Sequence, residues 1–349
     1  MLTKPDLTVE AATLQWLLSR LVCRLRTKLG FRYAQWQDVD SHFAQTVAEG
    51  YVHRERYQKE SAAKEREIRP LPIIFIHYGN SQYLRYSLEQ ARNSNPLSPI
   101  HLIGDEENNQ YAFVKHHLYR DYFNEASKFA SLYKHFCDQN QQWILFVFQR
   151  WFILKEFLRT HQLERCLHTD SDVMLYTDVT KDQQTFDEYD FTVSHGNMGS
   201  VFYVNTVEGL EKFCHFLMNV YSGKEQYYYD RMLAHFVCRQ NNHLRGGATE
   251  MTALAYYAEG HFGEIGEVSQ ILDGAVHDTC ITIPHPGFEM ENGIKKIIWK
   301  ANRPYGRHIR RGKEIRFKSL HFQGSSKSLM KDFLTPILTL DIQQEIDPR

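Results

Sequence analysis

Apolar and polar stretches alternate along the chain and predict strands and helices in turn. The run LPIIFIHYGN, residues 71–80, is apolar almost throughout, as is typical of a strand buried on both faces. Residues 81–96 then show a helical pattern, with Ser81 as the expected N-cap and an Asn-Pro pair as the stop. Residues 98–108 follow as a second short strand that ends in acidic residues.

A second helix and strand complete an α/β pattern. Residues 143–162 are an apolar helical stretch, which leads to the run ERCLHTDSDVMLY, residues 164–176. Strands and helices in alternation predict a mainly parallel sheet flanked by helices. Such sheets bind ligands where the carboxyl ends of their strands meet. We therefore expect Asp105 and the acids of residues 164–176 at one edge of the sheet.

The last third of the chain has an antiparallel pattern. Asn292-Gly293 separates two strand-like runs in residues 287–299, which is a strong hairpin signal. Residues 308–322 predict another hairpin around Gly312. Basic residues are frequent in this second hairpin, from Arg307 to Lys318. They indicate either a solvated hairpin face or a preference for an anionic acceptor.

The first 69 residues predict a helical extension. Leucines recur at three- and four-residue spacing in residues 14–29, and arginine and lysine occupy the other faces. Such a helix docks on its own protein or on a second copy, or it lies on an anionic membrane surface. We place domain boundaries at 1–69 for this extension, 70–330 for the main domain and 331–349 for a tail.

Composition narrows the class of protein only slightly. The 349 residues are 42% hydrophobic and 24% charged, with a net charge of -1, so bulk electrostatics favour neither nucleic acid nor membrane. The six cysteines are scattered singly, as expected for buried thiols in a reducing compartment. There is no apolar run of roughly 20 residues and no signal-peptide pattern at the start. We expect a cytoplasmic protein, with peripheral contact at the inner membrane surface through residues 14–29 as an alternative.

Two aspartates at the end of a strand are the first chemical signal. Asp170 and Asp172 follow a β-prone run, where burying carboxylates is costly unless they are neutralised. Strand alternation would place both carboxylates on one side and Ser171 on the other. Two hard oxygen ligands suit Mg²⁺ or Mn²⁺. The alternative is a pair of acids that close a loop through caps or salt bridges.

A second signal lies near the end of the chain, in the run LHFQGSSKSLM. A histidine at a strand end, His321, is suited to complete a metal site with two carboxylates. Gly324 would let the backbone approach a phosphate, and the Lys327 ammonium would neutralise phosphate oxygens. Taken singly, the histidine is as well explained by a structural role and the lysine by solvation.

Together, DSDVM and HFQGSSK resemble the motifs of GT-A-fold glycosyltransferases. The resemblance is closest to the retaining, family-eight-like group that contains glycogenin and the lipopolysaccharide galactosyltransferases. It implies a Rossmann-like GT-A fold and a Mn²⁺ or Mg²⁺ ion held by Asp170, Asp172 and His321. It also implies that Lys327 contacts the donor diphosphate and that Arg150 is a donor-binding arginine.

The resemblance further implies transfer of a sugar, in the manner of a hexosyltransferase, from a nucleoside diphosphate sugar such as a UDP-sugar. Residues 70–176 would form the nucleotide-sugar half and residues 177–330 the acceptor half. The acceptor is an unidentified glycan, lipid or protein, and we expect no nucleic acid partner. The expected donor contacts, besides Arg150 and Lys327, are His77, Tyr78, Asp105, Ser171 and Gly324. For His77 and Tyr78, packing at a strand end is the alternative.

Two acids are candidates for the catalytic role. An inverting transfer needs a carboxylate base, whereas in a retaining transfer the departing phosphate can take the acceptor proton. Glu250 is the first candidate for the base or for a sugar contact, and Asp230 is the second. The alternative for Glu250 is an acid stabilised at a helix N-terminus. Rival functions are a nucleotidyltransferase or phosphohydrolase on the same acids, and a non-catalytic GT-A-like scaffold.

Overall fold

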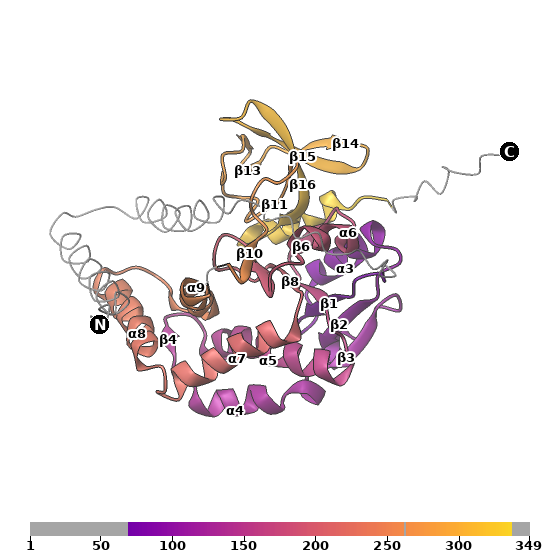
Figure 1. Cartoon of the computed structure of the whole chain (residues 1–349). Coiled ribbons are helices and arrows are strands. Elements are labelled where there is room, and N and C mark those ends of the chain that lie inside the picture. Colours follow the sequence, from indigo (N-terminus) through magenta and orange to yellow (C-terminus); the bar gives the residue numbers. More distant parts are fainter. Residues whose placement is uncertain (1–68, 262, 337–349) are drawn as a thin grey trace, which may run out of the picture.

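A seven-stranded sheet forms the centre of the fold, with the strand order β10-β7-β8-β5-β1-β2-β3 (Figure 1). The computed structural model describes residues 69–261 and 263–336. In chain order, the strands of this sheet are β1 (Ile73–Ile76), β2 (Ile100–Gly104), β3 (Lys115–Leu118), β5 (Cys166–Thr169), β7 (Phe191–Val193), β8 (Val201–Val204) and β10 (Ile265–Glu267).

The sheet is mainly parallel, as predicted. Strand β1 is buried along its whole length and pairs in parallel with β2 and with β5. Strand β8 runs antiparallel to its two neighbours, β5 and β7. Because β1, β2 and β5 run in one direction, the residues that follow them lie at one edge of the sheet.

Helices cover both faces of the sheet. Residues of α3 (Gln82–Ser94) and α6 (Val179–Gln183) share one hydrophobic cluster with β1 and β2. A larger cluster on the other face contains side chains of α4 (Asn124–Leu132), α5 (Gln141–Thr160), α7 (Val207–Tyr221) and α9 (Glu250–Gly260). The predicted α/β class is therefore confirmed.

The remaining elements are short, apart from one helix. Ser81 occupies the N-cap position of α3, as predicted, although its side chain makes no cap hydrogen bond. The other elements outside the C-terminal sheet are α8 (Gln226–Asn241), β4 (Phe136–Cys137), β9 (Gly247–Ala248), η1 (Glu106–Asn108), η2 (Tyr119–Tyr122) and η3 (Gln184–Phe186).

A second sheet follows in the last third of the chain, where an antiparallel region was predicted. Its order is β11-β16-β15-β14, and β6 also pairs with β16. The hairpin around Gly312 and the one at Asn292-Gly293 are both confirmed; the latter pair has φ values of 52° and 83°. The strands of this sheet are β6 (Val173–Leu175), β11 (Ala275–His277), β14 (Ile298–Lys300), β15 (Arg303–His308) and β16 (Lys313–His321). The strands β12 (Met290–Glu291) and β13 (Ile294–Lys295) form a separate two-stranded sheet, and the helix η4 (Gly324–Phe333) follows β16.

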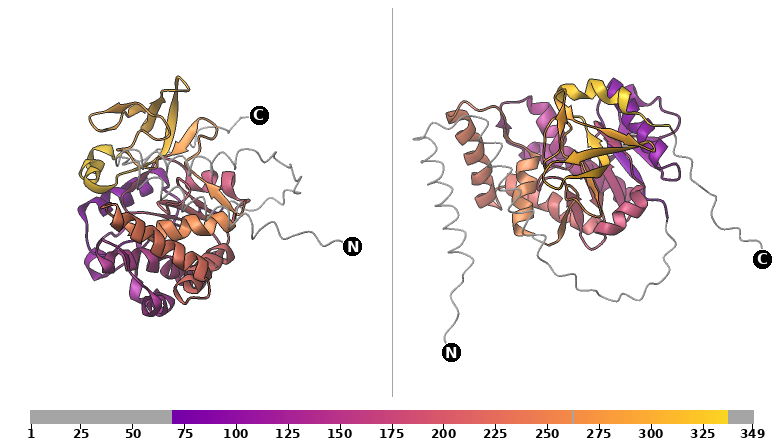
Figure 2. Two further views of the ribbon diagram at one scale, coloured as in Figure 1. Left: turned by 90° about the vertical axis from the view of Figure 1, so that its left-hand side faces the viewer. Right: turned by 90° about the horizontal axis from the view of Figure 1, so that it is seen from above.

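The pairing of β6 with β16 joins the middle of the chain to its end. The two strands are antiparallel, and His321 lies opposite Val173. Figure 2 shows the C-terminal sheet and η4 packed over one edge of the larger sheet. As a result, His321 is held next to the turn that precedes β6.

Several predictions concern residues outside those that the structure describes. They are the helical extension, including residues 14–29, and most of the tail. Because η4 runs to Phe333, it crosses the boundary predicted at residue 330. The division into a donor half and an acceptor half stays a prediction. Within the described ranges, no helix combines the length and the apolar character needed to cross a membrane.

Candidate active site

The two aspartates lie in a turn between two sheets. Strand β5 ends at Thr169 and β6 begins at Val173, whose amide donates to the carbonyl of Asp170 over 3.1 Å. The prediction that strand alternation aligns the carboxylates is therefore wrong. The turn is fixed on both sides, because the Asp170 amide donates to the carbonyl of Ser200 and the carbonyl of Asp172 accepts from the Phe322 amide.

His321 completes a cluster with the two aspartates. One ligand atom from each of the three residues lies within 4.8 Å of the others. The Nε2 atom of His321 is 3.3 Å from Oδ1 of Asp172. On the other side of the ring, Nδ1 lies 2.8 Å from the carbonyl oxygen of Thr279. Since a carbonyl only accepts, Nδ1 carries the proton and Nε2 faces the carboxylates.

A buried ion pair supports the strand that carries His321. The Asp278 carboxylate accepts from the backbone amide of His321 over 3.1 Å and from Nζ of Lys295 over 2.5 Å. Both side chains of the Asp278–Lys295 pair are fully buried. The position of the imidazole thus depends on a charge pair that bridges β13 and the segment after β11.

Arg150 joins two acids on the other side of the cluster. It extends from α5, and its guanidinium donates to Asp170 over 2.5 Å and to Glu250 over 3.3 Å. Burial raises the pKa of Asp170, and Arg150 opposes this shift. Burial also raises the pKa of Glu250, again against the effect of Arg150. Arg150 therefore links the acid turn to the N-terminus of α9, where Glu250 is the first residue.

Lys327 lies beside the second aspartate. Its Nζ atom is 3.1 Å from Oδ2 of Asp172 and 4.7 Å from the centre of the Tyr83 ring. Burial opposes ionisation of Asp172, but the contacts with His321 and Lys327 outweigh it and lower the pKa of this carboxyl. The two aspartates thus differ, with Asp172 the more readily ionised of the pair.

His77 contacts the acid turn from the end of β1. Its Nδ1 atom shares a hydrogen bond of 2.8 Å with the Ser171 hydroxyl. Burial lowers the pKa of His77 to about 4, so the ring is neutral at pH 7. The Nε2 atom is buried and has no hydrogen-bond partner in the described part of the chain. His77 and Ser171 are therefore brought to the site, as the donor-binding prediction requires.

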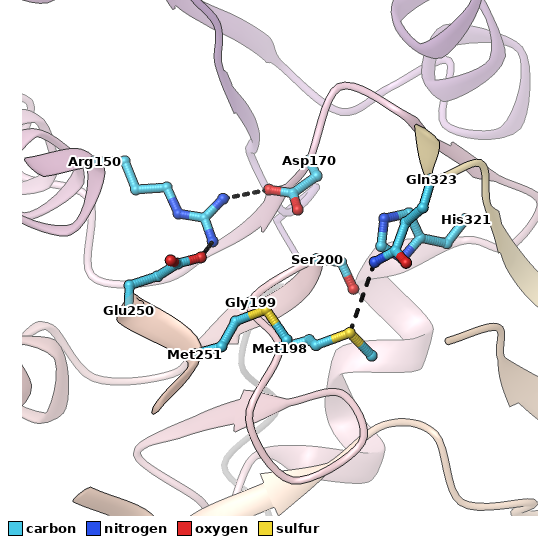
Figure 3. A pocket seen from close by; sticks show the side chains of 9 residues that line it. All are labelled: Arg150, Asp170, Met198, Gly199, Ser200, Glu250, Met251, His321 and Gln323. Carbon is cyan, nitrogen blue, oxygen red and sulfur yellow. Dashed lines mark hydrogen bonds and ion pairs between the residues drawn. The ribbon is translucent and has the colours of Figure 1, made fainter. Parts of the chain in front are cut away.

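A small cavity lies among these side chains (Figure 3). Its volume is about 40 Å³, more than the roughly 15 Å³ that one water needs. Arg150 and Glu250 lie on one side of it in the figure and His321 with Gln323 on the other. Its lining residues are Arg150, Asp170, Met198, Gly199, Ser200, Glu250, Met251, His321 and Gln323.

The segment from Met198 to Ser200 belongs to the run GNMGSVFYVN, which is rich in β-formers and small residues and resembles the strand that lies beside the donor sugar in GT-A-fold glycosyltransferases. A Cβ atom on Gly199 would meet the Trp151 ring at 2.3 Å, so glycine is required for the segment to approach α5. The Ser200 hydroxyl is buried without a hydrogen-bond partner within the described ranges. Sequence reasoning missed Ser200, Gln323 and Thr279. The only signals were the small residues of GNMGS and the position of Gln323 inside HFQGSSK.

Three expected donor contacts lie at the same edge but have other surroundings. Asp105 accepts from the amides of Gly79 and Glu107, at 2.6 and 3.0 Å, so its carboxylate caps the first turn of η1. Tyr78 is 65% exposed and lies about 6 Å from the rings of Tyr119 and Phe146. Gly324 opens η4 with a φ of 60°, and a Cβ atom added to it would meet nothing within 4 Å. Their donor-binding roles stay predictions.

Asp230 is not brought to the cluster. It is exposed on α8 and accepts from the Gln226 side chain over 2.8 Å. It does not line the cavity around Asp170. Of the two acids predicted to be catalytic, the structure places only Glu250 beside the aspartates.

The cluster fits a divalent metal ion. Arg150 contacts one oxygen of Asp170 and Lys327 contacts one oxygen of Asp172, so each carboxylate keeps another oxygen. With Nε2 of His321, these atoms offer two oxygen donors and one imidazole nitrogen. A mixed oxygen and nitrogen set of this kind suits Mn²⁺ better than Mg²⁺, which prefers oxygen alone.

A scan against protein-family models and a search of curated proteins find no match for this sequence. Among solved structures, the chain is similar to mouse xyloside xylosyltransferase 1 in its apo form, with 8% identity over 59% of this chain and 87% of that chain and a TM-score of 0.42. It is also similar to the glycosyltransferase GlyE of Streptococcus pneumoniae TIGR4, with 13% identity over 61% of this chain and 48% of that chain and a TM-score of 0.32. These likenesses are to part of the fold, and neither assigns this chain to a family.

Proposed function

We propose that the chain is a metal-dependent glycosyltransferase of the GT-A type. It would transfer a sugar from a nucleoside diphosphate sugar, with a UDP-sugar as the first donor to test, to an acceptor hydroxyl. The observation that carries this proposal is the meeting of Asp170, Asp172 and His321, from two distant parts of the chain, beside a cavity at the carboxyl edge of a parallel sheet.

Asp170, Asp172 and His321 would hold the metal, for which we propose Mn²⁺. A bound ion would neutralise negative charge on the diphosphate as the glycosidic bond breaks. Lys327, which already lies 3.1 Å from Asp172, would exchange this contact for a diphosphate oxygen. His77, with its buried and unpartnered Nε2, would offer the donor a neutral hydrogen-bonding group.

We propose a retaining course for the transfer. The contact of Glu250 with Arg150 supports a role for this residue in positioning the guanidinium and the donor sugar, in place of the alternative role as an independent base. The acceptor oxygen forms the new bond to the anomeric carbon as the bond from that carbon to the phosphate oxygen breaks. The acceptor proton passes to the departing phosphate, so no carboxylate base is needed.

The test is calorimetry of Mn²⁺ and a panel of nucleoside diphosphate sugars with the full chain and with Asp172→Asn. We expect Mn²⁺-dependent donor binding in the parent chain and its loss in the variant. Asp187→Asn, at an exposed carboxylate, is the matched control. Unchanged donor affinity in Asp172→Asn would remove this residue from the site.

Slow metal-dependent release of free nucleotide, without acceptor, separates the rival functions. A glycosyltransferase releases the nucleoside diphosphate from its sugar donor. A nucleotidyltransferase would instead need a nucleoside triphosphate and form pyrophosphate, a phosphohydrolase would cleave the donor to a nucleoside monophosphate and a sugar phosphate, and a scaffold would release nothing. Each of these three outcomes would contradict the proposal.

A further inference from the structure

The hairpin of β15 and β16 ends in an exposed tip that combines an apolar side chain with cations. Ile309, in the turn, is 65% exposed. Arg307, Arg310, Arg311 and Lys313 surround it in sequence, and all four are exposed. We call these five residues the hairpin tip.

Among the described residues, the four cations of the hairpin tip have no neutralising neighbour. None of them forms an ion pair within residues 69–261 and 263–336. The acid opposite Arg307 on the neighbouring strand is Glu314, and that carboxylate pairs with Lys300. Since the whole chain has a net charge of -1, the positive charge here is a local concentration.

The tip is only part of the basic run in the sequence. His308 and Lys318 are buried, and Lys318 pairs with Asp182 over 2.5 Å. The alternative of a solvated hairpin face therefore applies to only part of the basic run, because two of its residues are not solvated. A single exposed hydrophobic side chain is normal on a protein surface, so Ile309 is significant here because another exposed apolar side chain accompanies it.

A second exposed apolar segment lies against the tip. The Ile309 amide donates to the carbonyl of Gly287 over 2.9 Å, and the Gly287 amide donates to the carbonyl of Pro284. Next to Pro284, Ile283 is 41% exposed. Ile309 is thus hydrogen-bonded to the turn of residues 283–287, which presents a second exposed apolar side chain.

This turn connects the tip to the candidate active site. The rings of His285 and His195 lie 4.4 Å apart. His195 belongs to the same loop as Met198, which lines the cavity beside Asp170. The hairpin tip therefore lies on the side of the molecule where this loop borders the cavity.

We infer that the hairpin tip docks on an anionic lipid surface, with Ile309 entering the headgroup region and the four cations contacting lipid phosphates and carboxylates. Charge complementarity supports this occupant, because clustered basic residues bind anionic bilayers and an apolar side chain among them adds a contribution that salt does not screen. The inference does not depend on the proposed transfer reaction.

The test is sedimentation of the full chain with vesicles of phosphatidylcholine alone and of phosphatidylcholine containing phosphatidylserine. We expect binding to the anionic vesicles that weakens with salt. Arg310→Glu together with Arg311→Glu should lower the partition coefficient at least about tenfold, since each basic residue near the surface contributes about fivefold. Ile309→Ser should lower the part of the binding that persists at high salt.

Lys128→Glu together with Lys134→Glu is the matched control, because it makes the same change of charge at exposed lysines in and after α4. Equal binding of the parent chain and the Arg310/Arg311 variant would overturn the inference, since residues 14–29 would then account for any membrane affinity. Binding of free phosphate or of an oligonucleotide at the tip, without vesicle binding, would also overturn it. The variants change exposed side chains, and an unchanged thermal transition would verify their folding.

Discussion

His321 Nε2 faces Oδ1 of Asp172 across 3.3 Å, and the Thr279 carbonyl holds the opposite side of the ring. The imidazole is thus oriented before any ligand arrives. Such orientation by a second group is typical of histidines that bind metals. The role of His321 can therefore be tested with the metal alone, without a nucleotide or an acceptor.

His321→Ala should weaken Mn²⁺ binding at least about tenfold, because the cluster loses one of its three donor atoms. Titration of the full chain with Mn²⁺, followed by electron paramagnetic resonance, measures this affinity directly. His215→Ala, at an exposed histidine of α7, should leave it unchanged. Equal Mn²⁺ affinities in the parent chain and in His321→Ala would remove the histidine from the metal site.

Lys327→Met should separate donor binding from metal binding. Loss of the ammonium removes a charge-assisted contact to phosphate, which we expect to weaken donor affinity on the order of tenfold while Mn²⁺ affinity is retained. Calorimetry with and without donor checks both values. Lys331→Met, at an exposed lysine of the same helix η4, is the control. A loss of Mn²⁺ affinity with unchanged donor affinity would contradict the assignment.

Arg150→Met should destabilise the fold by about 3 kcal/mol, because Asp170 and Glu250 would lose their common partner in a buried site. Combining Arg150→Met with Glu250→Gln should recover part of this loss, since one of the two carboxylates is then neutral. Urea unfolding gives the free energies for the cycle. Strictly additive effects would show that Arg150 and Glu250 do not interact.

Tyr203→Phe should cost about 2 kcal/mol of unfolding free energy. The Tyr203 hydroxyl donates to Asp182 over 2.7 Å, and the same carboxylate contacts His277 and Lys318 in a buried network. Tyr305→Phe, at a partly exposed tyrosine, should have little effect. Thermal unfolding compares the two variants, and equal transitions would show that the Tyr203 hydroxyl contributes nothing to stability.

Stability should fall as the pH is lowered below about 6.5. Burial lowers the pKa of His168 to about 3 and that of His101 to about 4. In the unfolded chain these rings take up protons near pH 6.5, whereas in the fold they stay neutral until the pH approaches those lower values. Between the two limits the unfolded state binds more protons, so each ring lowers the unfolding free energy by about 1.4 kcal/mol per pH unit.

Urea unfolding between pH 8 and pH 5 measures this slope. His168→Gln should make the slope shallower, because the variant has one fewer ring to protonate on unfolding. An unchanged slope would mean that His168 is not responsible for the acid sensitivity.

The parts of the fold that could be predicted are those encoded by local pattern. The buried run of β1, the apolar helix α5 and the Asn292-Gly293 turn each fix their own structure within a few residues. The antiparallel pairing of β6 with β16 could not be predicted, because no local pattern specifies which distant strand pairs with a strand of only three residues. The turn at residues 170–172 was missed for a related reason: the apolar residues on both sides read as one continuous strand.

The residues of the candidate site also fall into two groups, those that the sequence predicts and those that it does not. Asp170, Asp172, His321 and Lys327 stand in recognisable spacings and are brought together. Ser200 contacts the Asp170 amide and Thr279 contacts the His321 ring, in both cases through a backbone carbonyl whose position depends on tertiary contacts, so their residue types carried no signal.

The ladder between β6 and β16 also bears on synthesis of the protein. A nascent chain that has left the ribosome only as far as Gly312 contains both aspartates but neither β16 nor His321. Truncated products of interrupted translation therefore lack an imidazole that the cluster needs. A strand that is made well after the two aspartates thus completes the candidate metal cluster.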